Sequence, residues 1–123
     1  MENIHAVIPQ KDWPWPGDLD ALIAAPDNHT LLFENEFVRV LDTVIIPGET
    51  TPLHTHCWPG AFYVLSWSDF VRRDQNGNTM ADSRKIESLA TPPQVLWLDS
   101  LPPHTLENVG AAEIRGISVE IKG

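Results

Sequence analysis

Short runs of hydrophobic residues alternate along this chain with prolines, glycines and polar turn residues. This pattern predicts many short strands and few helices. The 11 prolines are spread along the chain and divide it into segments too short for long helices. Asn76-Gly77 supplies the residues that a tight hairpin turn prefers. We expect seven or eight strands, drawn from residues 30–33, 37–46, 61–67, 70–73, 79 onward, 94–98, 104–109 and 114–121.

The first 29 residues differ from the rest and are expected to form an arm. Residues 12–17 alternate tryptophan and proline, and they cannot be helical because a residue before proline is forced into extended geometry. Asp18 is placed to cap a short helix over residues 19–25, which Pro26 ends. We expect this arm to pack over the strands or over a partner subunit.

Many short strands in a small chain favour a closed or two-sheet all-β architecture, because open sheet edges promote aggregation. The 123 residues suffice for one domain. We therefore expect a single domain over residues 1–123, with a barrel at about 30–123 and the arm at 1–29. The apolar bulk of the arm also predicts a homodimer.

Charge and composition limit the classes of molecule that this protein is expected to bind. Eight lysines and arginines against 17 acidic residues give a formal net charge of −9, which disfavours nucleic acids and anionic membranes. The single cysteine excludes an internal disulfide. No run of 18 apolar residues and no secretion signal is visible, so the sequence predicts a soluble, acidic, cytoplasmic protein.

The strongest candidate for chemistry is His54-Thr55-His56. Residues i and i+2 of a strand point to the same face, so both imidazoles can reach one cation. A third histidine, His104, begins a later strand and has Asn108 on the same face. Asn108 could fix the backbone or hydrogen-bond a metal ligand. A pair of solvated surface histidines is the alternative interpretation.

The spacing of these residues resembles a known family. Gly48, followed after five residues by His54-x-His56, resembles the first motif of the cupin superfamily, and His104-x3-Asn108 resembles the end of the second. The resemblance covers about residues 33–121. It implies a double-stranded β-helix (jelly-roll) barrel with a short N-terminal helix, and a metal held by His54, His56 and His104.

One departure from the family affects the ligands. Gly60 stands where the first motif has a glutamate. The motifs therefore supply at most three histidines, which remain a workable ligand set for one divalent Fe, Mn, Ni or Zn ion. Loss of the carboxylate raises the charge of the centre and favours anionic substrates. Gln94 could supply a weak further oxygen, although a solvated glutamine is the simpler interpretation.

Other residues have less specific interpretations. Phe62 could line the pocket or pack in the core. Arg39 and Arg115 could hold a substrate carboxylate or reach solvent from strand ends. Cys57 is expected to be a buried structural thiol pointing away from His54 and His56. The remaining histidines, at positions 5 and 29, are interpreted as surface residues.

Three functions remain open from the sequence. The first is a mononuclear metal enzyme, dioxygenase- or isomerase-like, acting on a small oxygen-rich organic substrate. The second is a non-catalytic module that binds or senses a small molecule. The third is a metal-free, epimerase-like cupin with a histidine base, a chemistry that needs a carboxylate to orient the histidine.

Overall fold

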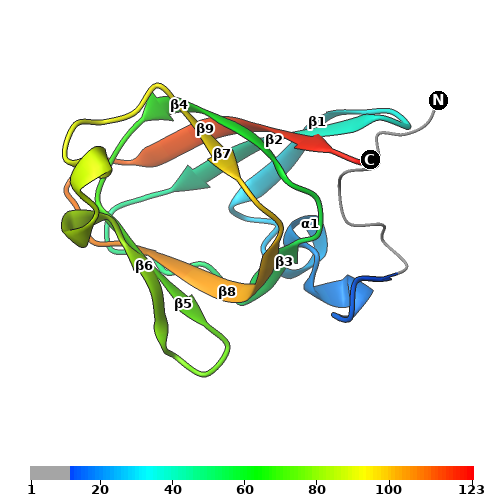
Figure 1. Cartoon of the computed structure of the whole chain (residues 1–123), viewed down its shortest axis with the longest axis horizontal. Coiled ribbons are helices and arrows are strands. Elements are labelled where there is room, and N and C mark those ends of the chain that lie inside the picture. Colours follow the sequence, from blue (N-terminus) through cyan, green and yellow to red (C-terminus); the bar gives the residue numbers. More distant parts are fainter. Residues whose placement is uncertain (1–11) are drawn as a thin grey trace.

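The computed structural model describes residues 12–123 and consists mainly of antiparallel strands (Figure 1). One sheet has five strands in the order β1-β2-β9-β4-β7, and the other has four in the order β3-β8-β5-β6. The strands are β1 (His29–Glu34), β2 (Val38–Ile45), β3 (His54–His56), β4 (Gly60–Ser66), β5 (Phe70–Asp74), β6 (Thr79–Asp82), β7 (Val95–Leu98), β8 (Leu101–Asn108) and β9 (Ile114–Ile121). The all-β prediction is confirmed.

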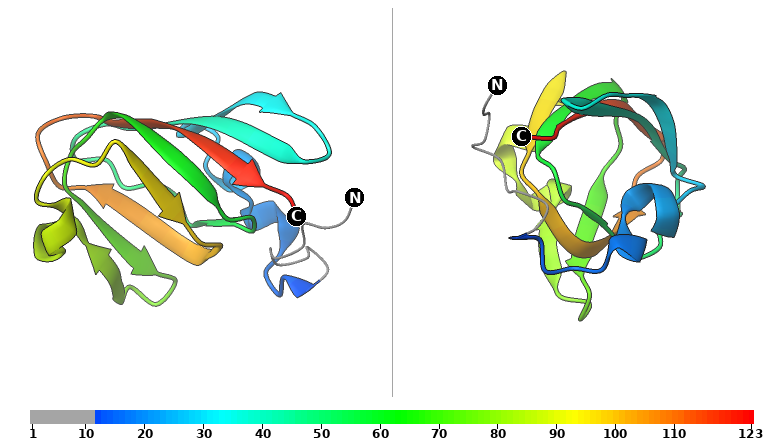
Figure 2. Two further views of the ribbon diagram at one scale, coloured as in Figure 1. Left: turned by 45° about the horizontal axis from the view of Figure 1, so that its top comes forward. Right: turned by 90° about the vertical axis from the view of Figure 1, so that its right-hand side faces the viewer.

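The two sheets face each other and enclose an interior, as the end-on view in Figure 2 shows. Strand β2 alternates half-buried and buried residues along its whole length, so its odd-numbered side chains point inward. Strand β9 pairs with β2 and turns its even-numbered residues to the same interior. Ile45, Phe70 and Ile114 form the buried hydrophobic cluster at one end of this interior.

The short helix α1 (Ala21–Ala24) lies beside β1 and β3 (Figure 1). It begins later than predicted, and a 3-10 helix, η2 (Gly17–Leu19), occupies the preceding residues. The expected cap was wrong: Asp20 caps α1 by accepting a hydrogen bond from the Leu22 N–H at 3.1 Å. Two further 3-10 helices, η3 (Ser83–Lys85) and η4 (Glu87–Leu89), connect β6 to β7.

Asn108, the last residue of β8, fixes the backbone at the end of the barrel away from the histidines. It is 1% exposed, and its amide donates to the carbonyl oxygens of Ile45 (2.9 Å) and Ala112 (2.8 Å). Its side-chain oxygen accepts from Ser68 and Gly110. Asn108 therefore ties β2, β8 and the loop before β9 together, which is the backbone role that the sequence left open.

The predicted hairpin joins β5 and β6. Gly77 has a φ of 84°, the left-handed conformation that glycine adopts without strain. No helix among residues 12–123 is long and apolar enough to span a membrane.

Candidate metal centre

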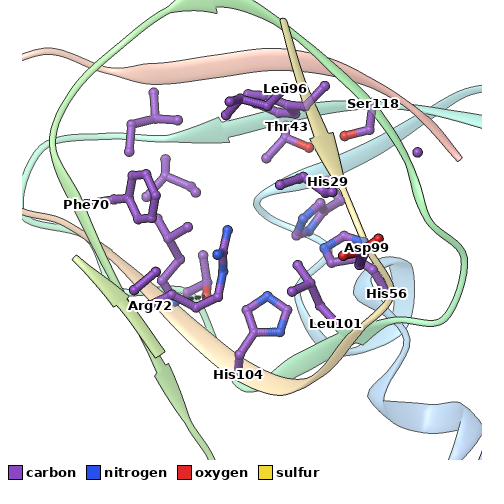
Figure 3. Close-up of a pocket in the computed structure, with 18 of the residues that line it drawn as sticks. His29, Thr43, His56, Phe70, Arg72, Leu96, Asp99, Leu101, His104 and Ser118 are labelled. Atoms are coloured by element: carbon purple, nitrogen blue, oxygen red, sulfur yellow. Dashed lines mark hydrogen bonds between the residues drawn. The ribbon is translucent and has the colours of Figure 1, made fainter. Parts of the chain in front are cut away.

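Four histidines from three strands meet at one place inside the barrel (Figure 3). His54 and His56 lie on β3, His104 lies opposite His54 on β8, and His29 begins β1. The ring of His54 is 4.9 Å from that of His29, 5.1 Å from that of His56 and 4.3 Å from that of His104, measured between centroids. His29, His54 and His104 are buried, and His56 is half-buried.

Each of these imidazoles uses Nδ1 for a hydrogen bond to an oxygen that can only accept. His29 donates to the carbonyl oxygen of Ala25 at 3.0 Å. His54 and His104 each donate to the carbonyl oxygen two residues earlier, at 2.7 and 2.8 Å. His56 donates to the Glu120 carboxylate at 2.8 Å. With the proton on Nδ1, the neutral ring keeps the lone pair of Nε2 available as a metal ligand.

Burial keeps the imidazoles of His29, His54 and His104 neutral. It lowers the pKa of His29 to about 4 and that of His54 to about 3, and the neighbouring His56 adds to both effects. Burial also lowers the pKa of His104 well below its usual value, and the nearby His54 and His56 lower it further. Protons therefore do not compete for these nitrogens near neutral pH, as a metal site requires.

A chain of buried charges supports His56. Glu120 on β9 accepts from His56 through one oxygen and from the Nε of Arg39 through the other, both at 2.8 Å. Arg39 also pairs with Asp20: each of its two terminal nitrogens donates to one oxygen of the Asp20 carboxylate at 2.9 Å. Burial alone would raise the pKa of Glu120, but the hydrogen bond from His56 and the charge of Arg39 outweigh it and lower the pKa. Glu120 is thus ionised and orients His56.

Gly60 lies in the same row of the sheet. The register pairs Arg39 of β2 with Glu120 of β9, and Glu120 with Gly60 of β4. A Cβ at Gly60 would come within 2.9 Å of the Glu120 Cα, so the row leaves no room for a side chain there. The carboxylate beside the histidines thus comes from β9, where it contacts His56 through a hydrogen bond.

The donor set fits a divalent transition metal. The ligand atoms offered by His29, His54 and His56 all lie within 4.8 Å of one another. An ion with bonds of about 2.1 Å holds its ligand atoms at most about 4.2 Å apart, so binding would draw these atoms slightly closer together. His104 completes the cluster beside His54, its ring centroid 5.7 Å from that of His56. Neutral imidazoles suit Fe, Ni, Cu and Zn ions.

The structure corrects three sequence interpretations. His29 is not a surface residue: it is 5% exposed and belongs to the cluster. Arg39 is neither a free substrate clamp nor a solvent-facing residue, because Asp20 and Glu120 occupy its guanidinium. Gln94 is exposed and absent from the cavity wall, and its backbone oxygen accepts from β4, so it offers no ligand there.

Several other interpretations agree with the structure. Phe62 is buried and lines the cavity. Cys57 is buried and free, and burial raises the pKa of its thiol to about 11, which keeps it protonated. Arg115 faces outward and pairs with Asp42 at 2.8 Å. His5 lies outside the described residues.

The sequence reasoning missed Asp20, Glu120 and Arg72. Glu120 carried a signal, because it shares parity with the inward-facing Gly116 and Ile114 of an otherwise apolar strand. Asp20 offered none, since its role depends on the folded arm. Arg72 sits next to Arg73 at a hairpin, where the sequence alone cannot tell which arginine faces inward.

The histidines form one part of the wall of a cavity of about 220 Å³ (Figure 3). The space is equivalent to about seven water molecules, at roughly 30 Å³ each. Its remaining wall is mainly hydrophobic and includes Ile45, Phe62, Trp67, Phe70, Leu96 and Leu106. A polar cluster on one side of an apolar cavity is typical of a small-molecule site.

No protein-family model and no curated protein matches this sequence. Among solved structures, a cupin domain from Bordetella pertussis Tohama I has a TM-score of 0.60 at 19% identity, covering 77% of this chain and 92% of the other. A Klebsiella pneumoniae protein with a double-stranded β-helix domain has 0.55 at 14%, covering 100% and 89%. An RmlC-like cupin family protein from Methanocaldococcus jannaschii has 0.54 at 11%, covering 76% and 77%. This chain shares the double-stranded β-helix fold of these proteins.

Proposed function

We propose that the four-histidine cluster binds one divalent ion, Fe, Mn, Ni or Zn, and that the protein is a mononuclear metal-dependent enzyme acting on a small oxygen-rich organic molecule. Two sets of three histidines could hold the ion, and both contain His54 and His56. The sequence predicts His104 as the third ligand, whereas His29 completes the most closely spaced set. The observation that carries the proposal is the arrangement of hydrogen bonds. All four rings place the proton on Nδ1 and leave Nε2 free to bind an ion.

The residues around the cluster have separate roles in this proposal. Glu120 holds the proton of His56 on Nδ1 and fixes the orientation of the ring. The apolar wall limits the water that can reach a bound substrate. A bound divalent ion would supply a Lewis acid that polarises substrate oxygens or a site for dioxygen. Oxidative cleavage or isomerisation of an oxygen-rich anion is the reaction class that suits this combination.

Metal analysis of the purified protein tests the binding step. After reconstitution with Fe, Mn, Ni or Zn and gel filtration, we expect close to one ion per chain in the wild type and a large loss in His54→Ala. Cys57→Ser is the matched control, because Cys57 is the next residue after His56 and a soft metal ligand, yet it stands apart from the cluster. Equal metal content in the wild type and His54→Ala would refute the proposal.

Comparing the metal content of His29→Ala with that of His104→Ala identifies the third ligand. The variant that loses more metal has lost the residue that completes the site with His54 and His56. Oxygen consumption with Fe(II) and a simple diketone or thiol acid then tests the dioxygenase-like class. Metal binding without turnover on any such substrate would favour the non-catalytic binding module instead.

One observation favours a second candidate, a metal-free acid–base enzyme of the epimerase-like kind. His56 and Glu120 form the histidine–carboxylate pair that this chemistry needs, at 2.8 Å and beside the cavity. Metal-free protein that exchanges substrate C–H for deuterium, and that loses this exchange in Glu120→Gln, would support this candidate over the metal enzyme.

A further inference from the structure

Arg72, in the middle of β5, carries a charge without a partner. Among residues 12–123, none of the seven ion pairs includes Arg72, and its buried Nε has no hydrogen-bond partner. Its neighbour Arg73 points to the other face of the strand and pairs with Glu107 at 2.9 Å. The two arginines therefore have opposite environments although they are adjacent in sequence.

The side chain of Arg72 extends into the cavity between Phe70 and His104 (Figure 3). Its guanidinium carbon lies 5.3 Å from the centre of the Phe70 ring, a cation–π contact. His54 and His104 line the same cavity, and the positive charge of Arg72 adds slightly to the lowering of their pKa values. Arg72 thus lines the cavity beside the histidine cluster.

No carboxylate of the described chain neutralises this charge. Two acidic residues line the cavity, Glu120 and Asp99. Glu120 is already shared by Arg39 and His56. Asp99 is exposed and accepts a hydrogen bond from the Trp97 indole at 3.3 Å. The guanidinium of Arg72 therefore has no direct carboxylate partner in the cavity wall.

A guanidinium without partners in an apolar cavity is costly for the folded state. Burial lowers the pKa of Arg72, but arginine stays protonated in proteins, so the site cannot avoid the cost by losing the proton. Unsatisfied buried donors in a folded protein call for an explanation, and a ligand that supplies the missing acceptor is one. The guanidinium fork matches the two oxygens of a carboxylate.

The rest of the wall limits the kind of anion. Arg72 is the single arginine or lysine among the residues that line the cavity within the described chain, so there is one positive side chain to match. A phosphate dianion would need more cationic partners, whereas a monocarboxylate needs one. The cavity of about 220 Å³ has room for a short apolar body against Ile45, Phe70 and Leu106.

We propose that Arg72 binds the carboxylate of a small monocarboxylic acid and orients the rest of the molecule beside the histidine cluster, with an apolar face against Ile45, Phe70 and Leu106. As a statement about the substrate, this rests on the proposed function. As a statement about binding it does not, because the carboxylate contacts Arg72 and requires no metal ion.

Calorimetric titration of metal-free protein with matched acids and amides tests the proposal. The probes are butanoate, hexanoate and benzoate, each compared with its neutral amide, which has nearly the same shape. In the wild type we expect at least one acid to bind about tenfold or more tightly than its amide. Arg72→Gln should abolish this preference, and Arg73→Gln should leave it within about twofold.

Equal affinities for acid and amide in the wild type, or an unchanged preference in Arg72→Gln, would overturn the proposal. A preference lost equally in Arg73→Gln would overturn it as well, because it would reflect the overall charge of the hairpin. Since Arg72→Gln could fail to fold, the Nε–Hε resonance of Arg72 in the wild type gives a second measurement. It should shift on addition of the acid and stay unmoved by the amide.

These results are independent of metal binding. If metal analysis of His54→Ala contradicts the proposed centre while the acid still binds through Arg72, the proposed function fails and the carboxylate site stands. If metal binds and no acid is preferred over its amide, the carboxylate site fails and the proposed metal centre stands.

Discussion

Replacing Gly60 by alanine tests the close approach of β4 and β9 beside the histidine cluster. A Cβ at this position would lie 2.8 Å from the carbonyl carbon of Val119 and 2.9 Å from the Cα of Glu120, with the Val119 oxygen nearer still. All of these are backbone atoms of the neighbouring strand, so no side-chain rotation relieves the overlap. The strands must separate at the row that holds Glu120.

The expected cost follows from the rigidity of the overlapping atoms. Overpacking a well-filled interior typically costs about 1–3 kcal/mol, and a backbone overlap belongs at the upper end. Alanine has less conformational freedom than glycine in the unfolded chain, and this difference stabilises the folded variant by roughly 0.5 kcal/mol. We expect Gly60→Ala to lower the free energy of unfolding by about 2–3 kcal/mol, and the melting temperature by about 10 °C for a domain of this size.

Urea and thermal unfolding, followed by circular dichroism, measure this loss. Gly17→Ala is the matched control, because nothing lies within 4 Å of a Cβ there, and its effect should stay within about 0.5 kcal/mol. If Gly60→Ala were as stable as Gly17→Ala, the close strand approach would be refuted. Gly60→Glu should likewise destabilise the fold, so a gain in metal affinity in this variant would also contradict the geometry.

Three further predictions concern the supporting contacts. Glu120→Gln should lower metal affinity about 10–100-fold in a chelator competition, because His56 loses a charged acceptor; unchanged affinity would refute this role. Metal-free protein should lose stability as pH falls from about 6.5 to about 4, since unfolded histidine takes up protons that folded His29, with a pKa of about 4, does not. The share of that loss due to His29 is about 3 kcal/mol. Urea unfolding of His29→Gln at several pH values should therefore show a smaller change of stability with pH than the wild type. The exposed Tyr63 and Trp97 could form the contact of the predicted homodimer. Light scattering should then show that Trp97→Asp is a monomer, and a monomeric wild type would contradict the predicted homodimer.

The strands could be predicted because their periodicity is local. The alternation along β2, for example, follows from hydrophobic residues at every second position, and tertiary structure then decides which face is inside. The start of the helix could not be placed to the residue. Asp18 and Asp20 are both acceptable caps, and Asp20 caps α1 while it also pairs with Arg39, a contact that the local sequence does not reveal.

Part of the candidate site could also be predicted, because it depends on a local feature of the sequence. His54 and His56 are found from their spacing on one strand. His29 is not, because it reaches the cluster through pairing of β1 with β2 and a hydrogen bond from its ring to Ala25. The sequence left Arg39 either inside the barrel or at solvent, and only the fold shows that its guanidinium is buried and occupied while Arg72 has no partner.

The charge of the cavity follows from the position of its carboxylates. Gly60 leaves no room for a side chain in its row, and Glu120, the carboxylate that contacts the cluster, already pairs with Arg39 and His56. A divalent ion held by neutral imidazoles would add two positive charges to the cavity, and the guanidinium of Arg72, which pairs with no carboxylate, lies in the same wall. The net charge of −9 lies mostly on the surface, where salt screens it over about 10 Å. An acidic protein can therefore attract an anion into its interior, because charges buried in a low-dielectric cavity are screened much less.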